Sequence, residues 1–257
     1  MKGEMARLTS MRILLAFPLI ALAAMADAAD CTVSSDAQSR ALVELYTSEG
    51  CSSCPPADRW LSDLATSGDK RVVPLAFHVS YWDYIGWKDR FADARYTERQ
   101  RDLAQAQGAS MVYTPQVMIG GQDFRRWSSA GAVDRAIDEI AKTPAPARIA
   151  IASRPAGEAG IDGNASLQST AKSRDVSLFV ALTQDGLSSK VTAGENRGEN
   201  LRHHAVVRDL VLIPAGSGAF HFARKPDWDL AHMSLVAFAQ DPANGHVLQA
   251  LMAPLCR

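Results

Sequence analysis

The feature that most constrains the fold is a pair of cysteines between a strand-like run and a helix-like run. Cys51 and Cys54 form the sequence C-S-S-C. The run Ala41–Thr47 before them is typical of a buried strand, and apolar residues at helical spacing follow them as far as Gly68. The first cysteine of such a pair lies at a helix N-terminus, where unpaired N–H groups and the helix dipole stabilise a thiolate. The pattern therefore predicts thiol redox chemistry.

The two cysteines are expected to have different roles. Cys51 attacks a substrate disulfide, and Cys54 resolves the mixed disulfide that results. The two prolines after Cys54 lack an N–H and fit only the first helical turn, so the helix must begin near Cys54 and leave Cys51 exposed. The nearby acids Glu49 and Asp58 disfavour a thiolate, so we expect the pKa of Cys51 to fall only to roughly 6 to 7.5. A purely structural Cys51–Cys54 disulfide is the alternative.

The first half of the chain predicts an α/β domain over residues 30–143. Its expected order is strand, helix, strand, helix, hairpin, helix. After the first strand and helix come a strand over 71–80, a helix over 92–108, a hairpin of 116–119 and 123–127 around Gly120 and Gly121, and a helix capped by Ser128 or Ser129.

The second half has a different periodicity. The stretch TPAPA at 143–147 is typical of a short, stiff linker. Beyond it, apolar residues recur at every second position in several short runs. Turn signals separate these runs, namely Asp162-Gly163, Asp185-Gly186 and Asn244-Gly245. This pattern predicts an antiparallel β-sandwich over residues 144–257.

Residues 1–29 are typical of a secretory signal peptide. Basic residues precede an uncharged, mostly apolar run over 13–26, and Ala26-Asp27-Ala28 has the small-x-small pattern of a cleavage site. The apolar run is shorter than the roughly 20 residues that a membrane-spanning helix needs. A buried N-terminal helix is the alternative, and Asp30 before Cys31 argues against lipid attachment. We therefore expect a periplasmic or secreted protein without a membrane span in its mature chain.

Cys31 and Cys256 lie near the two ends of the mature chain. Chain ends are often close in space and disulfides persist in exported proteins, so we expect these cysteines to be paired rather than free. They are badly placed to complete a zinc site with the C-S-S-C pair, and no two histidines have zinc-finger spacing. His203 and His204 are adjacent, and neighbouring strand residues point to opposite faces. We expect no metal and no other cofactor.

Composition excludes several classes. Of 257 residues, 47% are hydrophobic and 21% charged, as in ordinary globular proteins. The formal net charge is -1, so no basic excess favours nucleic acid as a partner.

The first half resembles the thioredoxin-like superfamily. The whole mature chain is similar to the bacterial secreted family called domain of unknown function 1223. The matching stretches are ELYTSEGCSSCPPAD, FHVSYWDYIGWKDRFADARYTERQ, YTPQVMIGG and GENRGENLRHHAVVR. The resemblance implies a thioredoxin-like fold with the redox pair at Cys51 and Cys54, and it implies no substrate. A Ser-Ser spacer and paired prolines distinguish this site from thioredoxin itself.

The same resemblance implies two further site residues. Thioredoxins keep a cis-proline facing the cysteines, and Thr114-Pro115 has the matching place before the predicted hairpin. An ordinary trans proline at a strand edge is the alternative. Thioredoxins also carry a buried acid that moves protons to and from the resolving cysteine, and Glu44 lies at a similar place. A solvent-facing strand carboxylate is the alternative for Glu44.

An aromatic cluster follows the second predicted strand. Loops after parallel strands gather at one sheet edge, so this cluster should lie beside Cys51 and rim a groove for a peptide substrate, with His78 and Asp83 close by. Simple packing of the loop is the alternative. The cluster consists of Tyr81, Trp82, Tyr84 and Trp87.

These observations predict an exported thiol–disulfide oxidoreductase. Its partners would be a protein thiol or disulfide substrate and a second redox protein that supplies or accepts electrons. Two alternatives stay open. A copper metallochaperone could use Cys51, Cys54 and His78, since thiolates suit Cu(I). A binding module could use the same disulfide only for structure.

Overall fold

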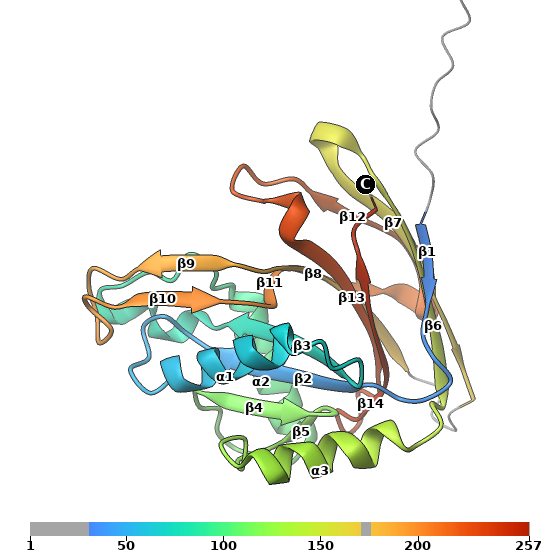
Figure 1. The fold of residues 1–257 in the computed structure, drawn as a ribbon, viewed down its shortest axis with the longest axis horizontal. Helices are drawn as coiled ribbons and strands as arrows, with labels where there is room; N and C mark the ends of the chain where they lie inside the picture. Colours follow the sequence, from blue (N-terminus) through green and yellow to red (C-terminus); the bar gives the residue numbers. More distant parts are fainter. Residues whose placement is uncertain (1–30, 171–175, 257) are drawn as a thin grey trace, which may run out of the picture.

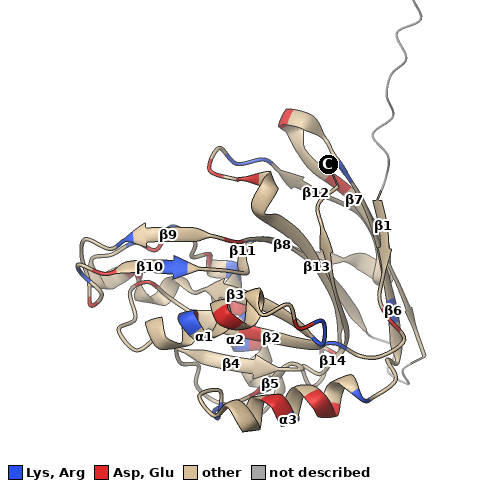
Figure 2. Cartoon of the chain, viewed as in Figure 1, with Lys and Arg blue, Asp and Glu red and all other residues tan. Residues whose placement is uncertain are grey.

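The structure, a computed structural model, describes residues 31–170 and 176–256. The predicted signal peptide lies outside these residues. The described chain is a mixed α/β structure dominated by sheets (Figure 1). Basic and acidic side chains are scattered over both halves of it (Figure 2). Within the described residues, no helix is long and apolar enough to cross a membrane.

A large mixed sheet runs through both halves of the chain. Its eight strands, in spatial order, are β14 (Val247–Pro254), β13 (Met233–Gln240), β8 (Ser177–Gln184), β11 (Val206–Ile213), β3 (Val72–His78), β2 (Ala41–Thr47), β4 (Gln116–Ile119) and β5 (Gln122–Asp123). β2 and β3 are parallel and therefore end at the same sheet edge. That edge is where the C-S-S-C pair begins.

Helices cover both faces of the N-terminal part of this sheet. The alternation of side chains along β2 explains this arrangement, because Val43 and Leu45 face one side while Leu42 and Tyr46 face the other. The first side packs against α1 (Pro55–Thr66) and α3 (Ala130–Ala141), and the second packs against α2 (Ala94–Ala106). The predicted helices are thus present, within two residues of their predicted ends.

The large sheet crosses the predicted boundary between residues 143 and 144. β11 lies parallel to β3 through the pair Val206 and Ala76, and the Ala76 N–H donates to the Ala205 carbonyl at 2.8 Å. A shared hydrophobic cluster joins the halves, since Phe77 of β3 packs with Phe238 of β13. The two halves therefore share part of one core.

A second sheet packs on the C-terminal part of the first. Its four strands are β1 (Cys31–Ser34), β6 (Ala147–Pro155), β7 (Gly160–Ser169) and β12 (Ser217–Ala223). The two sheets enclose one apolar cluster, which includes Ile149, Phe222 and Leu235. β1 comes from the N-terminal end of the described chain, and Cys31 at its start is disulfide-bonded to Cys256. The pairing of these two cysteines agrees with the sequence expectation.

One predicted turn is wrong. Asp162 and Gly163 lie inside β7, where Gly163 pairs with Phe220 of β12. A Cβ on Gly163 would come within 2.3 Å of the Phe220 ring, so the glycine is needed for close packing rather than for a turn. The other two turn signals lie between strands, and Gly186 and Gly245 have positive φ there.

Short elements complete the fold. β9 (Leu187–Lys190) and β10 (Asn200–His203) form a separate antiparallel hairpin. The short 3-10 helices are η1 (Ser80–Ile85), η2 (Gly157–Ala159), η3 (Pro214–Gly216) and η4 (Leu230–His232). The hairpin and η1 both lie near the carboxyl ends of β2 and β3, where they help to build the site described next (Figure 1).

Candidate redox site at Cys51 and Cys54

Cys51 and Cys54 form a disulfide at the junction between β2 and α1, with their Cα atoms 5.4 Å apart. Cys54 is the N-cap of α1, and the prolines occupy the first helical turn as the sequence predicts. The predicted exposure of Cys51 is wrong, because both cysteines have 0% of their surface exposed. Only the spacer residues Ser52 and Ser53 are exposed.

The loop that joins β9 to β10 covers this disulfide. The Asn196 side-chain amide donates to the carbonyl oxygens of Glu49 and Cys51, at 2.8 and 2.9 Å. The Glu195 carboxylate accepts a hydrogen bond from the Ser52 N–H at 3.0 Å. The loop comes from the second half of the chain, so both halves build the site.

Thr114 and Pro115 directly precede β4, the strand that pairs with β2. Their peptide bond is cis, which is the geometry that the resemblance implies. Trp82 connects them to the cysteine loop, because its indole N–H donates to Thr114 Oγ1 at 2.7 Å and its Cβ lies 3.1 Å from the position of a Cβ on Gly50.

The remaining aromatic residues have different surroundings. Trp87 donates its indole N–H to Glu49 Oε2 at 2.9 Å, and Tyr81 donates its hydroxyl to Gln100 at 3.2 Å. Tyr84 is 83% exposed. Two of the four predicted rim residues, Trp82 and Trp87, therefore contact the site through their indole groups. Tyr84 is the most exposed of the four.

A cluster of buried acids and imidazoles lies behind the disulfide. His78, at the end of β3, has its Nδ1 2.6 Å from Asp89 Oδ2. His203, at the end of β10, has its Nε2 3.1 Å from Glu49 Oε1. The two imidazole rings are in edge contact, with centroids 4.9 Å apart. Asp58 of α1 joins them electrostatically, and all five side chains are buried.

The buried position of these groups shifts their pKa values in opposite directions. Burial raises the pKa of Asp58 above its usual range, against the opposing effect of His203 and His78. Burial lowers the pKa of His78, but the carboxylates of Asp89, Asp58 and Glu49 together outweigh burial, and the net pKa of His78 is raised. Burial also raises the pKa of Glu49, but its hydrogen bonds with His203, Ser189 and Trp87 together outweigh burial and lower that pKa. Asp58 is thus the carboxyl of this cluster whose pKa is raised.

Three buried polar atoms in this cluster have no hydrogen-bond partner within the described chain. They are Thr47 Oγ1, Asp58 Oδ2 and His78 Nε2. Buried polar groups almost always have a partner in proteins, either protein or ordered water. Ordered water is a usual partner of such atoms, and Glu44 Oε2, outside this cluster, also has no partner within the described chain.

Glu44, which the sequence predicts as the proton-transfer acid, does not belong to this cluster. It is buried on the opposite face of β2, where its Oε1 accepts two bonds from the Arg99 guanidinium of α2, at 3.1 and 2.6 Å. Strand alternation gives the reason, because Glu44 shares the α2 face with Leu42 and Tyr46 while α1 covers the other face. The solvent-facing alternative for Glu44 is therefore wrong, whereas its proton-transfer role stays a prediction.

Sequence reasoning missed the roles of four residues of this site. It identifies Asp58 only as an acid near the pair, although Asp58 follows Cys54 by four residues and therefore lies on the same helix face. The sequence does not distinguish Asp89 from the other acids after His78, because its burial is a tertiary property. His203 and Asn196 carried no sequence signal, because they reach the cysteines only through the tertiary placement of the β9–β10 hairpin.

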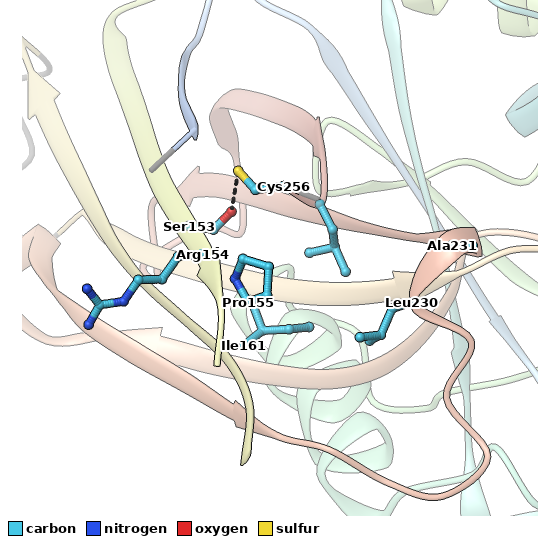
Figure 3. Close-up of a pocket in the computed structure, with 8 residues that line it drawn as sticks. Ser153, Arg154, Pro155, Ile161, Leu230, Ala231 and Cys256 are labelled. Atoms are coloured by element: carbon cyan, nitrogen blue, oxygen red, sulfur yellow. Dashed lines mark hydrogen bonds between the residues drawn. The ribbon is translucent and has the colours of Figure 1, made fainter. Parts of the chain in front are cut away.

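The described residues contain no group of three or more His, Cys, Asp and Glu side chains arranged to hold a metal ion. An apolar pocket of about 360 Å³ lies elsewhere, beside Cys256 (Figure 3). Pro155, Ile161 and Leu230 line it, while the Arg154 guanidinium extends away from them. This pocket shares no lining residue with the Cys51–Cys54 site.

The fold is similar to two solved structures. One is protein AGR_C_4864 from Agrobacterium tumefaciens, with a TM-score of 0.60 and 23% identity over 85% of this chain and 96% of that one. The other is HBP35 of Porphyromonas gingivalis, with a TM-score of 0.61 and 13% identity over 86% of this chain and 76% of that one. No match is found among curated proteins. The sequence profile of the family described as "Protein of unknown function (DUF1223)" matches residues 42–240, which is most of the chain, so the chain belongs to this family.

Proposed function

We propose that this protein is an exported thiol–disulfide oxidoreductase whose N-terminal half is thioredoxin-like. The observation that carries the proposal is the Cys51–Cys54 disulfide at a strand–helix junction, with Asp58, a buried carboxyl of raised pKa, one helical turn beyond Cys54. Pro115 is the proposed cis-proline of this site, as the resemblance implies, and Trp82 links the adjacent Thr114 to the cysteine loop. Protein disulfides are the proposed substrate class, a second redox protein is the proposed partner, and residues 1–29 are the proposed export signal.

The proposed reaction exchanges one disulfide for another. When the pair acts as a reductant, the Cys51 thiolate attacks a substrate sulfur, a mixed disulfide forms, and the first substrate thiolate leaves. Asp58 then accepts the Cys54 proton, and the Cys54 thiolate attacks Cys51 and releases the second substrate thiolate. Two electrons pass to the substrate, Cys51 and Cys54 end as a disulfide, and the proton leaves Asp58 through the His78–Asp89 pair. Asp58 thus takes the role that the sequence assigns to Glu44.

The pH profile of Asp58→Asn tests this role. We expect the wild type to lose resolving-step activity as the pH falls through the raised pKa of Asp58, because the neutral carboxyl cannot accept the Cys54 proton. The Asn variant should lose this inflection and turn over roughly a hundredfold more slowly. Glu44→Gln is the matched control and should keep the wild-type profile. An inflection that survives in Asp58→Asn would remove Asp58 from the mechanism.

The same variant has a second readout in stability. The pKa of Asp58 is higher in the folded chain than in the unfolded chain. The protonated carboxyl therefore contributes its full stabilisation below the unfolded pKa, and this contribution is lost as the pH rises through the folded pKa. At pH 7 the ionised Asp58 is therefore a cost, and Asp58→Asn should raise the free energy of unfolding in urea by about 1 kcal/mol. Glu44→Gln weakens a buried ion pair and should lower it.

Equilibration with glutathione tests the function itself. The carboxylates of Glu49, Asp89 and Glu195 near the pair disfavour a Cys51 thiolate, and the strong oxidants of this class depend on a stabilised reduced form. We therefore expect a reduction potential near -270 mV rather than near -120 mV, which describes a reductant that needs an electron donor.

Other outcomes of this titration favour the alternative functions. The unfolded protein is the positive control, in which both cysteines are accessible to glutathione. A pair that equilibrates there but never in the folded protein indicates a binding module with a structural disulfide. Stoichiometric Cu(I) binding by the reduced protein, lost in His78→Ala, indicates a metallochaperone. One observation favours that second function: Asp89 holds Nδ1 of His78 and leaves Nε2 unpartnered, as in many histidine metal ligands.

A further inference from the structure

We infer that the segment Gly194–Gly198 is a lid that gates access to the Cys51–Cys54 disulfide, with Asn196 as its latch. The gating role rests on the proposed function, and the contacts of this loop with the cysteine loop support the lid itself. It concerns the segment between β9 and β10, which lies more than a hundred residues from the cysteines in sequence.

The lid makes two kinds of contact with the cysteine loop. Asn196 is 6% exposed. Its side-chain amide donates to two backbone carbonyls, that of Glu49 and that of Cys51. Glu195 is exposed, but its carboxylate accepts the Ser52 N–H, and this hydrogen bond lowers the pKa of Glu195. Together these bonds fix the backbone on both sides of the Cys51 sulfur.

The disulfide cannot react while these contacts persist. Thiol–disulfide exchange requires a thiolate to approach a sulfur from outside, and both cysteines are fully buried. A reactive pair of this kind therefore needs a part that moves. The lid is the part whose contacts with the cysteine loop are polar, and local opening is easiest where few apolar contacts must be broken.

The backbone of the lid has the geometry of a hinged segment. Gly194 and Gly198 bound it, and their φ values of 72° and 96° lie in the left-handed region that glycine adopts without strain. The Gly198 N–H donates to the Val191 carbonyl at 2.9 Å, and a Cβ position on Gly194 lies 3.2 Å from Trp87, so both ends are anchored and the motion is confined between them. Hinges are typically a few loop residues that absorb such backbone changes.

The base of the lid is held firmly, which separates lid motion from motion of the whole hairpin. Val191 and Leu201 are buried, and the Val191 N–H donates to the Glu199 carbonyl at 2.9 Å. Arg90 also donates to the Ser188 carbonyl of β9 at 2.9 Å. The opening that we infer is therefore confined to Gly194–Gly198 and leaves the His203–Glu49 contact in place.

The rate of disulfide reduction by dithiothreitol tests the lid. Samples of the folded full-length protein are alkylated at intervals, and peptide mass mapping counts Cys51 and Cys54 separately from Cys31 and Cys256. We expect Asn196→Ala to speed reduction of Cys51–Cys54 on the order of tenfold, because two buried hydrogen bonds are lost. Glu195→Ala, at an exposed side chain, should speed it less.

Two controls are built into this experiment. The Cys31–Cys256 disulfide lies on another part of the molecule, so its reduction rate should be the same in every variant. Glu199→Gln changes an exposed acid just outside the lid and should leave both rates unchanged. Wild-type rates at Cys51–Cys54 in Asn196→Ala and Glu195→Ala would overturn the lid.

The lid and the proposed function can fail separately. Faster reduction in the lid variants, with no catalysis of insulin reduction by any form of the protein, keeps the lid and rejects the oxidoreductase. If the wild type and the lid variants catalyse insulin reduction equally fast, and dithiothreitol reduces Cys51–Cys54 equally fast in all of them, the oxidoreductase function stands and the lid is rejected.

Discussion

Replacement of Cys51 by serine is expected to abolish catalysis of insulin reduction by dithiothreitol, down to the uncatalysed background. Serine keeps the size of the side chain but does not form the thiolate that attacks a disulfide. No other described cysteine can substitute, because Cys31 and Cys256 are bonded to each other in a different part of the fold. The change in turbidity as the insulin chains precipitate measures the rate directly.

The paired variant Cys54→Ser makes this prediction specific to the proposed roles. It keeps the attacking thiol and removes the resolving one, so the mixed disulfide with substrate should accumulate. Non-reducing gel electrophoresis and intact mass would show the covalent adduct with Cys54→Ser and none with Cys51→Ser. An adduct formed only by Cys51→Ser would reverse the two roles, and activity retained in both variants would reject the disulfide as the reactive group.

The local parts of the site could be predicted from the sequence because they depend on neighbouring residues. β2 has the predicted bounds Ala41–Thr47, and α1 begins at Pro55 because two consecutive prolines are tolerated only in a first turn. The burial of Cys51 could not be predicted in this way. It accompanies the hydrogen bond from Asn196 to the Cys51 carbonyl, which requires the tertiary placement of the β9–β10 hairpin.

Glu44 shows which part of a site the sequence can predict and which part it cannot. Strand alternation places Glu44 on the same face as Leu42 and Tyr46, while Asp58 lies one helical turn beyond Cys54 on the buried face of α1. What the sequence could not supply was the partner of Glu44. Arg99 is 55 residues away, and it is buried between Glu44 and the rings of Phe179 and Phe238 from the other half of the chain.

The second large effect concerns the disulfide between Cys31 and Cys256. Replacing Cys31 and Cys256 together by alanine should lower the free energy of unfolding by about 5 kcal/mol, because that bond closes a loop with a sequence separation of 225 residues in the unfolded chain. The bond also ties β1, an edge strand of the four-stranded sheet, to the end of the chain after β14. For a protein of this size the loss corresponds to a fall in Tm of about 10 to 20 °C.

Replacing Cys51 and Cys54 together by alanine is the matched control, since it removes the same chemical group but a loop with a sequence separation of only 3. The chain-entropy argument gives about 2 kcal/mol for so short a loop, so the two double variants should differ by about 3 kcal/mol in urea unfolding at pH 7. Equal losses would mean that native-state contacts rather than loop closure set the stability. A larger loss from the Cys51/Cys54 double variant would mean that this bond serves stability, as in the binding-module alternative. The expected result, a larger loss from the Cys31/Cys256 double variant, agrees with a Cys51–Cys54 bond that opens and closes during turnover.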